Sequence, residues 1–321
     1  MDDLQIRNMF EPLFADLRDG DSFPVKSPLL AHYTSVQALE AILRSNEIWF
    51  SNPLFMNDME EVRFGISVGA NLFLTSTELE FACGNKERFE RLKWTFNHYY
   101  NTFANEHVID TYVSCLSEHV KDDTDGLLSM WRGYGGNGSG AAIVFDAGKL
   151  PIRDDAPLIF ARVQYASTEE RTNWLQRLTT QFAKILGQAN IPDDKLWLGS
   201  YMFFERLKLF AVFTKHQGFK EENEWRVVYM KDRDRGKAFE QMISYWVGAR
   251  GVEPKLKIKI EDIPDLTDDD LSLSKIVERI ILGPSLSSPL ARASILKMLD
   301  TLGRSDLKDR IKTSTIPFRA G

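Results

Sequence analysis

The stretch LLAHYTSVQALEAILRSNEIWFSNPLFMNDMEE, residues 29–61, carries the pattern on which the predicted fold depends. It opens with an apolar run that ends in His32–Thr34. Apolar residues then recur at the spacing of one helical face, and Thr34 or Ser35 can cap that helix through a side-chain oxygen. The run IWF follows Asn46, where the helix can end. The pattern predicts a strand, a capped helix and a second strand, with a histidine and a hydroxyl at the end of the first strand.

The composition predicts a folded protein of the cytoplasm. The chain has 321 residues, of which 43% are hydrophobic, and its formal net charge is -6, so a broad basic field for nucleic acid is absent. The two cysteines, Cys83 and Cys115, suit a reducing compartment and form no metal-binding or disulfide pattern. No signal peptide and no segment of membrane-spanning length is apparent, so we expect no membrane association.

The remaining chain alternates helical and strand patterns without a regular βαβ rhythm, which predicts an α+β fold. Residues 1–28 are expected to form a helix and a linker, and residues 29–321 a single domain. The helical segments are expected at 1–19, 60–103 with a break near 83–85, 127–134 (a short helix or turn), 168–217 as a helical insert, and 288–302. The strands are expected at 108–116, 141–145, 163–165, 225–230, 245–247, 256–260, 276–282 and 312–318. A polar loop is predicted at 117–126, with His119 exposed to solvent.

Four polar groups lie beside predicted strands, and spacing alone leaves open whether they converge. They are His32-Tyr33-Thr34, Asn57-Asp58 with Glu61, Trp131 with Tyr134, and Glu222-Asn223-Glu224. The glycines that follow Trp131 permit a close approach of backbone to a ligand. The letters GxGxxG there are a weak dinucleotide signal, because a strand and not a helix follows them.

The set HYT…ND..E…MW..Y…G…F…EWR resembles a large bacterial family known only as a domain of unknown function. The resemblance extends from about Leu29 to Arg319, and it includes the closing IIxGP and S.IPFR. The opening LLAHYTSVQALEAILRSNEIWFS is similar, more distantly, to ADP-ribosyltransferase folds of the DNA-modifying toxin branch. ENEWRVVY is similar to the other end of that site, where a glutamate heads a strand. This second resemblance implies a split β-sheet core with surrounding helices, and NAD as substrate.

The same resemblance implies roles for individual residues. His32 and Thr34 would position the dinucleotide, with Tyr33 between them. Tyr33 stands where the poly-ADP-ribose branch has glycine, and a Tyr-x-x-x-Tyr element is absent, so the nicotinamide pocket is not assigned. Glu224 would be the catalytic carboxylate, and Glu222 would orient the acceptor. Tyr134 or Trp131 would pack against the nicotinamide.

Each of these residues also has a structural interpretation. His32 can hydrogen-bond a backbone carbonyl, and Trp131 and Tyr134 can be core or rim aromatics. Glu224 can pair with Arg226 or Lys220. Cys115 on its apolar strand is expected to be a small buried hydrophobe. The Asn57-Asp58 pair is expected to cap the next helix, with Glu61 as capping-box partner.

Three classes of function follow. The first is an NAD-dependent ADP-ribosyltransferase-like enzyme, which the resemblance implies is a toxin or phage-defence effector acting on a nucleic acid or a protein. The second is a non-catalytic module that senses a nucleotide. The third is an RNA-processing enzyme, a nuclease or a 2′-phosphate transferase, in which Arg226, Lys215 and Lys220 would add a salt-dependent contribution to binding.

Overall fold

The chain divides into two compact units, each built from three segments. The helical unit comprises Met1–Ser22, Asn52–Thr111 and Val163–Lys220, and the sheet unit comprises Phe23–Ser51, Tyr112–Arg162 and Glu221–Gly321. The computed structural model describes residues 1–17, 28–56, 59–153, 156–248, 251–264, 266–267 and 270–318. The predicted helical insert falls within the helical unit, and the single domain over 29–321 stays a prediction.

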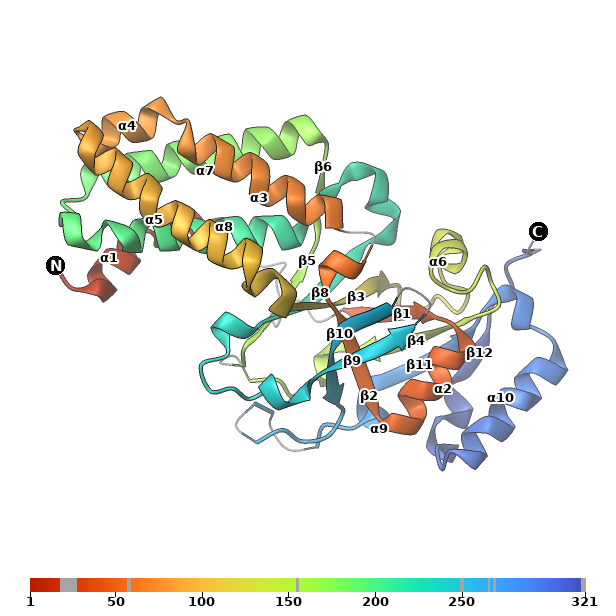
Figure 1. Cartoon of the computed structure of the whole chain (residues 1–321). Coiled ribbons are helices and arrows are strands. Elements are labelled where there is room, and N and C mark those ends of the chain that lie inside the picture. The colour runs from red at the N-terminus through yellow and green to blue at the C-terminus, as the bar shows by residue number, and fades with distance from the viewer. Residues whose placement is uncertain are drawn as a thin grey trace. The chain divides into compact units, whose positions relative to one another are not determined.

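The helical unit packs its helices around a continuous apolar core (Figure 1). Its helices are α1 (Asp3–Met9), α3 (Met59–Leu74), α4 (Thr77–Cys83), α5 (Lys86–Asn105), α7 (Thr168–Gln188) and α8 (Leu196–Phe213). Two short strands, β6 (Gln164–Ala166) and β7 (Thr214–His216), pair in parallel. Phe73 of α3 is fully buried at the centre, with its ring stacked on Phe96 at 4.2 Å and tilted against Phe203 at 4.8 Å.

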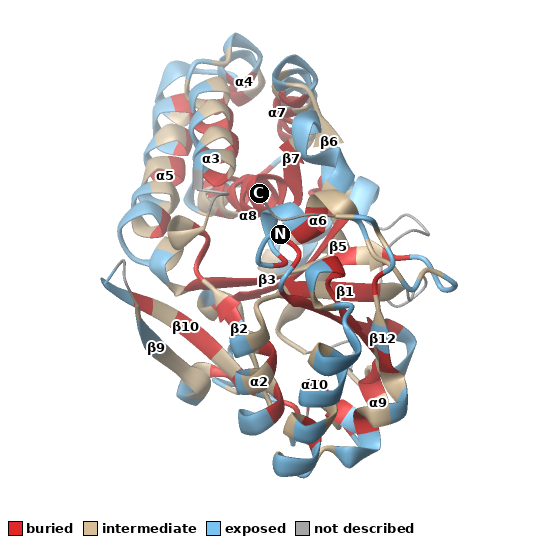
Figure 2. Cartoon of the chain, turned by 90° about the vertical axis from the view of Figure 1, so that its right-hand side faces the viewer, coloured by how far each residue is buried: buried red, intermediate tan, exposed pale blue. Residues whose placement is uncertain are grey.

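Helix α8 is buried along nearly its whole length, as Figure 2 shows. It is apolar on all sides, which is typical of a helix surrounded by others. Helix α3 approaches it closely because a glycine stands at the contact: a Cβ on Gly65 would lie 2.7 Å from the Ala211 Cα. The charged residues of α8 are paired within the unit. Lys208 Nζ lies 2.6 Å from Glu205 Oε1, and Arg206 donates to the Leu13 carbonyl at 2.9 Å. No helix of the described residues is long and apolar enough to cross a membrane.

The sheet unit is organised around a mixed sheet, ten-stranded over the described residues, and the fold class is α+β as predicted. The main path runs β12-β11-β4-β1-β3-β2-β10-β9, with β8 paired to β3 and β5 paired to β8. The strands are β1 (Leu29–Thr34), β2 (Glu47–Ser51), β3 (Thr111–His119), β4 (Ala141–Asp146), β5 (Leu158–Arg162), β8 (Glu224–Met230), β9 (Ile243–Gly248), β10 (Gly251–Lys259), β11 (Val277–Leu282) and β12 (Ile311–Thr313). Its helices are α2 (Val36–Ser45), α6 (Leu128–Gly133), α9 (Leu273–Ile276) and α10 (Pro289–Thr301).

The two faces of β1 and β4 are covered differently. Helices α2, α9 and α10 pack on the face that carries Ile143, whereas α6 packs Trp131 on the face that carries Tyr33 (Figure 1). Of the two caps considered from the sequence, Thr34 and Ser35, the structure uses Ser35, which accepts a hydrogen bond from the Ala38 amide at 3.1 Å at the start of α2. Helix α2 ends at Asn46, whose φ of 58° is left-handed.

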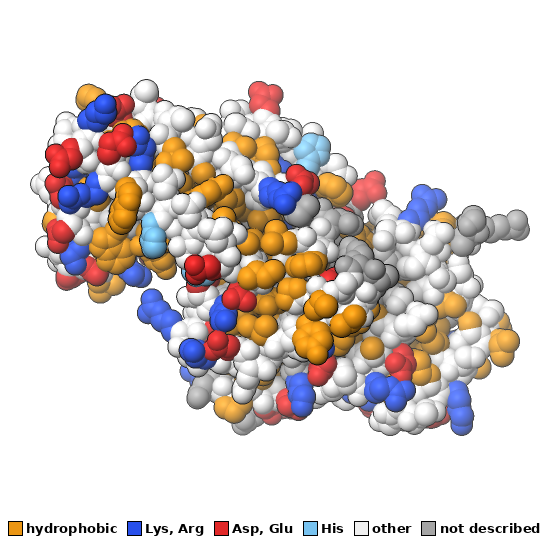
Figure 3. Space-filling model, viewed as in Figure 1, with side chains coloured by type: hydrophobic (Ala, Val, Ile, Leu, Met, Phe, Trp, Pro, Cys, Tyr) orange, Lys and Arg blue, Asp and Glu red, His pale blue; other side chains and the backbone are white. Residues whose placement is uncertain are grey.

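The outer edge of the sheet exposes apolar side chains. Strand β9 is the last in the order, and Tyr245 and Val247 are each 63% exposed. Val252 of β10 is exposed to the same extent. Apolar side chains gather over this part of the sheet in Figure 3. An exposed edge of this kind is a possible pairing surface for another chain.

Several predicted boundaries are wrong. The strand predicted at 108–116 begins only at Thr111, because residues 107–110 form a 3-10 turn. It then extends to His119, which is buried and not exposed as predicted. The predicted helix over 168–217 gives way to strand β7, and strand β5 was not predicted. The closing strand covers only Ile311–Thr313, and the N-terminal segment is α1 followed by the 3-10 helix Glu11–Leu17.

Candidate functional site

A tyrosine and a glutamate meet at the head of strand β8. Tyr134 follows the last residue of α6, and its hydroxyl donates a hydrogen bond of 2.8 Å to Glu222 Oε1. The two residues are 88 positions apart in the sequence. Tyr134 is 43% exposed and Glu222 is half-buried, so the pair lies at the surface of the sheet unit. We call it the Tyr134–Glu222 pair.

The backbone beneath this pair is fixed by strand β3. Ser117 Oγ donates to the Glu222 carbonyl at 2.7 Å, and the Glu118 amide donates to the Asn223 carbonyl at 2.9 Å. Asn223 has a φ of 43°, and Arg162 Nη2 donates to its side-chain oxygen at 2.6 Å. The left-handed Asn223 joins the 3-10 helix Gln217–Glu222 to strand β8, so these contacts fix the backbone of Glu222. The Tyr134 hydroxyl then holds its carboxylate.

Glu224 lies in a different environment. It is 4% exposed, and Arg226 donates to its two oxygens at 2.8 and 3.0 Å. Arg226 is itself 1% exposed, so this is a buried, bidentate pair. Of the two partners considered from the sequence, the structure records Arg226. The role of Glu224 as catalytic carboxylate stays a prediction.

Tyr33 and Trp131 form a buried aromatic pair on the α6 side of the sheet. Their rings meet edge-to-face at 4.8 Å, and neither is more than 6% exposed. The Tyr33 hydroxyl accepts from the Leu127 amide at 2.9 Å, and Trp131 Nε1 donates to the Asp125 carbonyl at 2.8 Å. Burial raises the pKa of Tyr33 to about 12, more than the Leu127 amide lowers it. Both side chains therefore act as core aromatics that hold α6, and Tyr134 is the accessible one.

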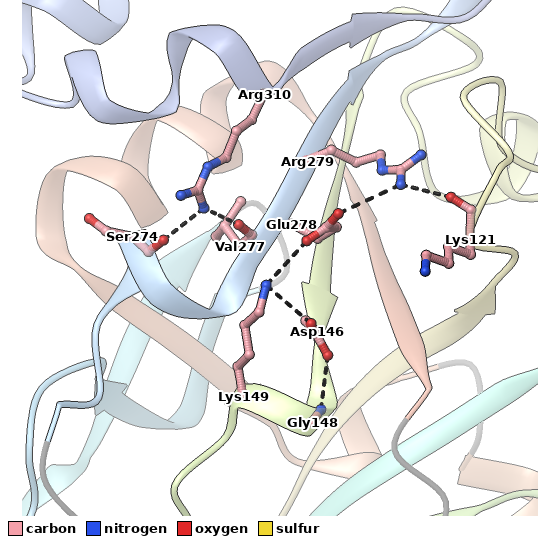
Figure 4. Close-up of polar contacts among 9 residues, drawn as sticks. All are labelled: Lys121, Asp146, Gly148, Lys149, Ser274, Val277, Glu278, Arg279 and Arg310. Carbon is pink, nitrogen blue, oxygen red and sulfur yellow. Dashed lines mark hydrogen bonds and ion pairs between the residues drawn. The ribbon is translucent and has the colours of Figure 1, made fainter.

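The loop between β3 and α6 is fastened to the sheet from several sides. His119 Nε2 lies 2.8 Å from the Asp123 carbonyl, and burial lowers the pKa of this histidine. Arg279 of β11 donates to the Lys121 carbonyl at 2.7 Å (Figure 4) and to that of Asp123 at 3.1 Å. In the same view Lys149 bridges two carboxylates at the end of β4 and the start of β11. The His119 and Arg279 contacts hold the loop that supports Tyr33 and Trp131.

The glycine-rich turn after α6 packs against neighbouring parts of the sheet unit. A Cβ on Gly140 would lie 2.2 Å from the Thr34 carbonyl oxygen. The Gly138 amide donates to the Trp131 carbonyl at 3.1 Å, and the Ser285 amide donates to the Gly138 carbonyl at 3.0 Å. The turn closes over the ends of β1 and β11, which accounts for its glycines without a ligand.

His32 and Thr34 belong to the opposite face of the sheet. Side chains alternate along a strand, and Tyr33 packs toward α6, so its two neighbours point away from α6. His32 lines an apolar cavity on that face. Burial lowers its pKa below the ordinary 6.5, and a hydrogen bond with the Cys115 backbone offsets part of this effect. The structure thus brings Tyr134 and Glu222 together, and it leaves His32 and Thr34 outside that pair.

The other predicted polar group is described only in part. Asn57 and Asp58 lie outside the described residues, as does Arg319 of the closing motif. Arg171 Nη1 donates to the Glu61 carboxylate within the helical unit, and the Arg171 guanidinium lies 4.3 Å from the Phe64 ring centroid. Within the described part of the chain, no three His, Cys, Asp or Glu side chains gather as a metal site would need.

Sequence reasoning missed the residues that support the site. Ser117, Glu118 and Arg162 were assigned to a loop or left without an element. Ser117 and Glu118 bond the 222–223 backbone, Arg162 bonds the Asn223 side chain, and Trp225 Nε1 donates to Glu118 at 2.9 Å. The one available signal was the strand pattern that precedes Ser117. Its continuation into a polar segment was hidden because the partners lie more than 100 residues away.

A family model described as "Protein of unknown function (DUF2971)" matches residues 130–227. This match supports the predicted resemblance to a domain-of-unknown-function family. No curated protein and no solved structure matches the chain. The matched segment begins in α6 and ends in β8, so both members of the Tyr134–Glu222 pair lie within it.

Proposed function

We propose that this protein is an ADP-ribosyltransferase-like enzyme that uses NAD as substrate, with Glu222 as the acting carboxylate. The observation that carries the proposal is the Tyr134–Glu222 hydrogen bond of 2.8 Å at an accessible position. Glu222 is a better candidate than Glu224, because the Glu224 charge is already compensated by two bonds from Arg226. Glu224 would then position the head of β8.

The reaction needs few chemical groups. The bond between ribose C1′ and the nicotinamide nitrogen breaks, and its electron pair leaves with nicotinamide. The acceptor forms the new bond to C1′ and loses a proton. Positive charge develops on the ribose during this exchange, and a fixed carboxylate stabilises it. Removal of one such group costs roughly 10²–10³ in rate, by analogy with an oxyanion-hole donor.

Tyr134 supports this role in two ways. Its hydroxyl orients the Glu222 carboxylate through a hydrogen bond of 2.8 Å, and its exposed ring offers an apolar surface to nicotinamide. A toxin or phage-defence effector that modifies a nucleic acid or a protein belongs to the same proposal and rests on the resemblance of the opening strand and of the EWR segment.

The buried Glu224–Arg226 pair favours a second candidate, a non-catalytic module that binds a nucleotide. A protein whose predicted catalytic carboxylate is neutralised by arginine can keep a binding surface without turnover. This candidate differs from the first in one measurable respect: it predicts binding of NAD without release of nicotinamide.

Titration calorimetry with NAD and an assay of nicotinamide release test both candidates. The variants are Glu222→Gln and Tyr134→Phe, with Glu221→Gln as the matched control on the exposed neighbour. We expect Glu222→Gln to lower release about 100-fold or more while binding persists, and Glu221→Gln to behave as the wild type. Binding without release would support the sensing module. Neither binding nor release would contradict the use of NAD, and dependence on an RNA substrate would then favour RNA processing.

A further inference from the structure

The C-terminal segment, residues 314–318, packs against the face of the sheet unit that carries α6. The Ser314 amide donates to the carbonyl of Leu282, the last residue of β11, at 2.9 Å, and Ser314 is 1% exposed. Ile316 packs against the apolar cluster that contains Trp131. The segment is therefore held at the place where α6 meets the sheet.

Asp125 joins this segment to α6. Its carboxylate accepts hydrogen bonds from the Thr315 amide and, at 3.0 Å, from the Thr315 hydroxyl. Its backbone carbonyl accepts from Trp131 Nε1 at 2.8 Å. Trp131 is a fully buried residue of α6, so the residue that receives the C-terminal segment also receives the side chain that anchors the helix. A shift of the segment would therefore reach α6 through Asp125.

Phe318 makes a second contact, with the chain that flanks Tyr134. The Arg132 guanidinium lies 5.5 Å from the centroid of the Phe318 ring. On the other side of Tyr134, a Cβ on Gly138 would lie 2.7 Å from Phe318 Cδ1, so the ring lies directly on the backbone of the glycine-rich turn. The C-terminal segment thus contacts the chain both before and after Tyr134.

Helix α6 depends on such contacts for its position. It has only six residues, and its N-cap, Leu127, makes no side-chain hydrogen bond to the first turn. A helix of this length is not stable by itself, so packing against its neighbours fixes it. Tyr134 directly follows the helix, and its hydroxyl lies 2.8 Å from Glu222 Oε1. This bond tolerates little displacement of α6, since a hydrogen bond is lost beyond about 3.5 Å.

We propose that Asp125 and Phe318 are positioning residues, which hold α6 so that the Tyr134 hydroxyl meets Glu222. Neither residue belongs to the Tyr134–Glu222 pair, and both act through α6. The placement of Tyr134 does not depend on the proposed function, whereas an effect on the release of nicotinamide rests on it. A segment that only stabilised the fold would leave the Tyr134 hydroxyl in place in every variant that folds.

Fluorine NMR of the whole protein labelled with fluorotyrosine reports on the contact at Tyr134. Tyr134→Phe identifies the signal, and Glu222→Ala gives its position when the acceptor is absent. In Asp125→Ala and in Phe318→Ala, we expect the Tyr134 signal to move toward that position. Asp125→Asn keeps an oxygen that can accept from Thr315, so its signal should stay near that of the wild type.

The matched control is Asp122→Ala, which removes an exposed carboxylate from the same loop and should leave the Tyr134 signal unchanged. Circular dichroism shows whether each variant is folded. Unchanged signals in folded Asp125→Ala and Phe318→Ala would overturn the proposal. If Asp125→Ala fails to fold, Phe318→Ala decides it, because that substitution leaves the bonds of Asp125 in place.

Nicotinamide release separates this proposal from the proposed function. If the wild type releases nicotinamide, Asp125→Ala should lower the rate about two- to tenfold, as the loss of one hydrogen bond allows. The same substitution added to Tyr134→Phe should lower it no further, because Asp125 acts through Tyr134, and an additive loss would contradict this. If the wild type releases none, the use of NAD is contradicted and the fluorine spectra still decide the positioning.

Discussion

In the helical unit, α3 presents Gly65 to α8 so that the two backbones nearly touch, whereas in the sheet unit β1 and β3 separate and leave a cavity of about 100 Å³ beside His32. The first arrangement leaves little space for an added atom. The second leaves an unfilled apolar space that one titratable side chain, His32, lines. The difference teaches that close backbone packing and unfilled internal space occur in different units of this chain. The following predictions are ordered by the size of the expected effect.

The largest effect is expected from Phe73→Ala in the helical core. The ring is fully buried and contacts Phe96 and Phe203, so its loss leaves a void that close-packed helices cannot fill. We expect a loss of about 3–5 kcal/mol in the free energy of unfolding. Urea denaturation followed by circular dichroism measures it. A loss below about 1 kcal/mol would mean that this core is loosely packed.

The contact between α3 and α8 should tolerate no additional atom. A Cβ at Gly65 would lie 2.7 Å from the Ala211 Cα, and backbone cannot move aside as a side chain can. We expect Gly65→Ala to cost about 1–3 kcal/mol from overpacking, which exceeds the gain of at most about 1 kcal/mol in helix propensity.

The matched control for that substitution is Gly133→Ala at the end of α6, where an added Cβ meets nothing within 4 Å. Its stability should stay within about 0.5 kcal/mol of the wild type. Urea midpoints of the two variants give the comparison directly. Equal midpoints would contradict the close approach of α3 and α8.

The sheet unit should lose stability as the pH falls. The pKa of folded His32 is below the ordinary 6.5, so the unfolded chain binds more protons once the pH drops below that value. The contribution of His32 to the free energy of unfolding is complete above pH 6.5. Below that pH it declines, by at most about 1.4 kcal/mol per pH unit. His32→Leu should flatten the profile between pH 7 and pH 5. His119 also has a lowered pKa, so part of the slope should remain. Parallel profiles for variant and wild type would disprove the effect.

The smallest effect is expected from partial filling of the cavity. Ala147→Val adds apolar volume beside an open space, and such changes commonly stabilise by about 0.5–2 kcal/mol. We place this one near the lower limit because the added side chain still has to find a rotamer without strain. Thermal unfolding measures it. Destabilisation by more than about 1 kcal/mol would show that Ala147 is already tightly packed.

The local parts of the fold were predictable because their signals lie within a few residues. The strand at 29–34, the cap of the following helix at Thr34 or Ser35 and the stop of that helix at Asn46 all depend on neighbours in sequence. Strand β5 and the extension of β3 through His119 depend on distant partners, since β5 pairs with β8 and Glu118 contacts Asn223. No pattern within either segment reveals such pairing.

The residues of the site could be predicted from the sequence, but their arrangement in space could not. Tyr134 and Glu222 were both singled out, and their hydrogen bond spans 88 residues. His32 was grouped with them, yet strand alternation directs its side chain to the other face, opposite to that of Tyr33. The face on which the His32 side chain lies depends on which face of the sheet α6 covers. The packing of Trp131 decides which face α6 covers.

Strands β5 and β8 are antiparallel neighbours, with Arg162 opposite Trp225, so they form a hairpin whose connection is the whole segment from Val163 to Lys220 and the residues that follow it. The two ends of this segment leave the sheet unit side by side. The entropic cost of closing a loop rises only slowly with its length. The antiparallel pairing of β5 and β8 therefore tolerates a long connection, which contributes α7 and α8 to the core of the helical unit.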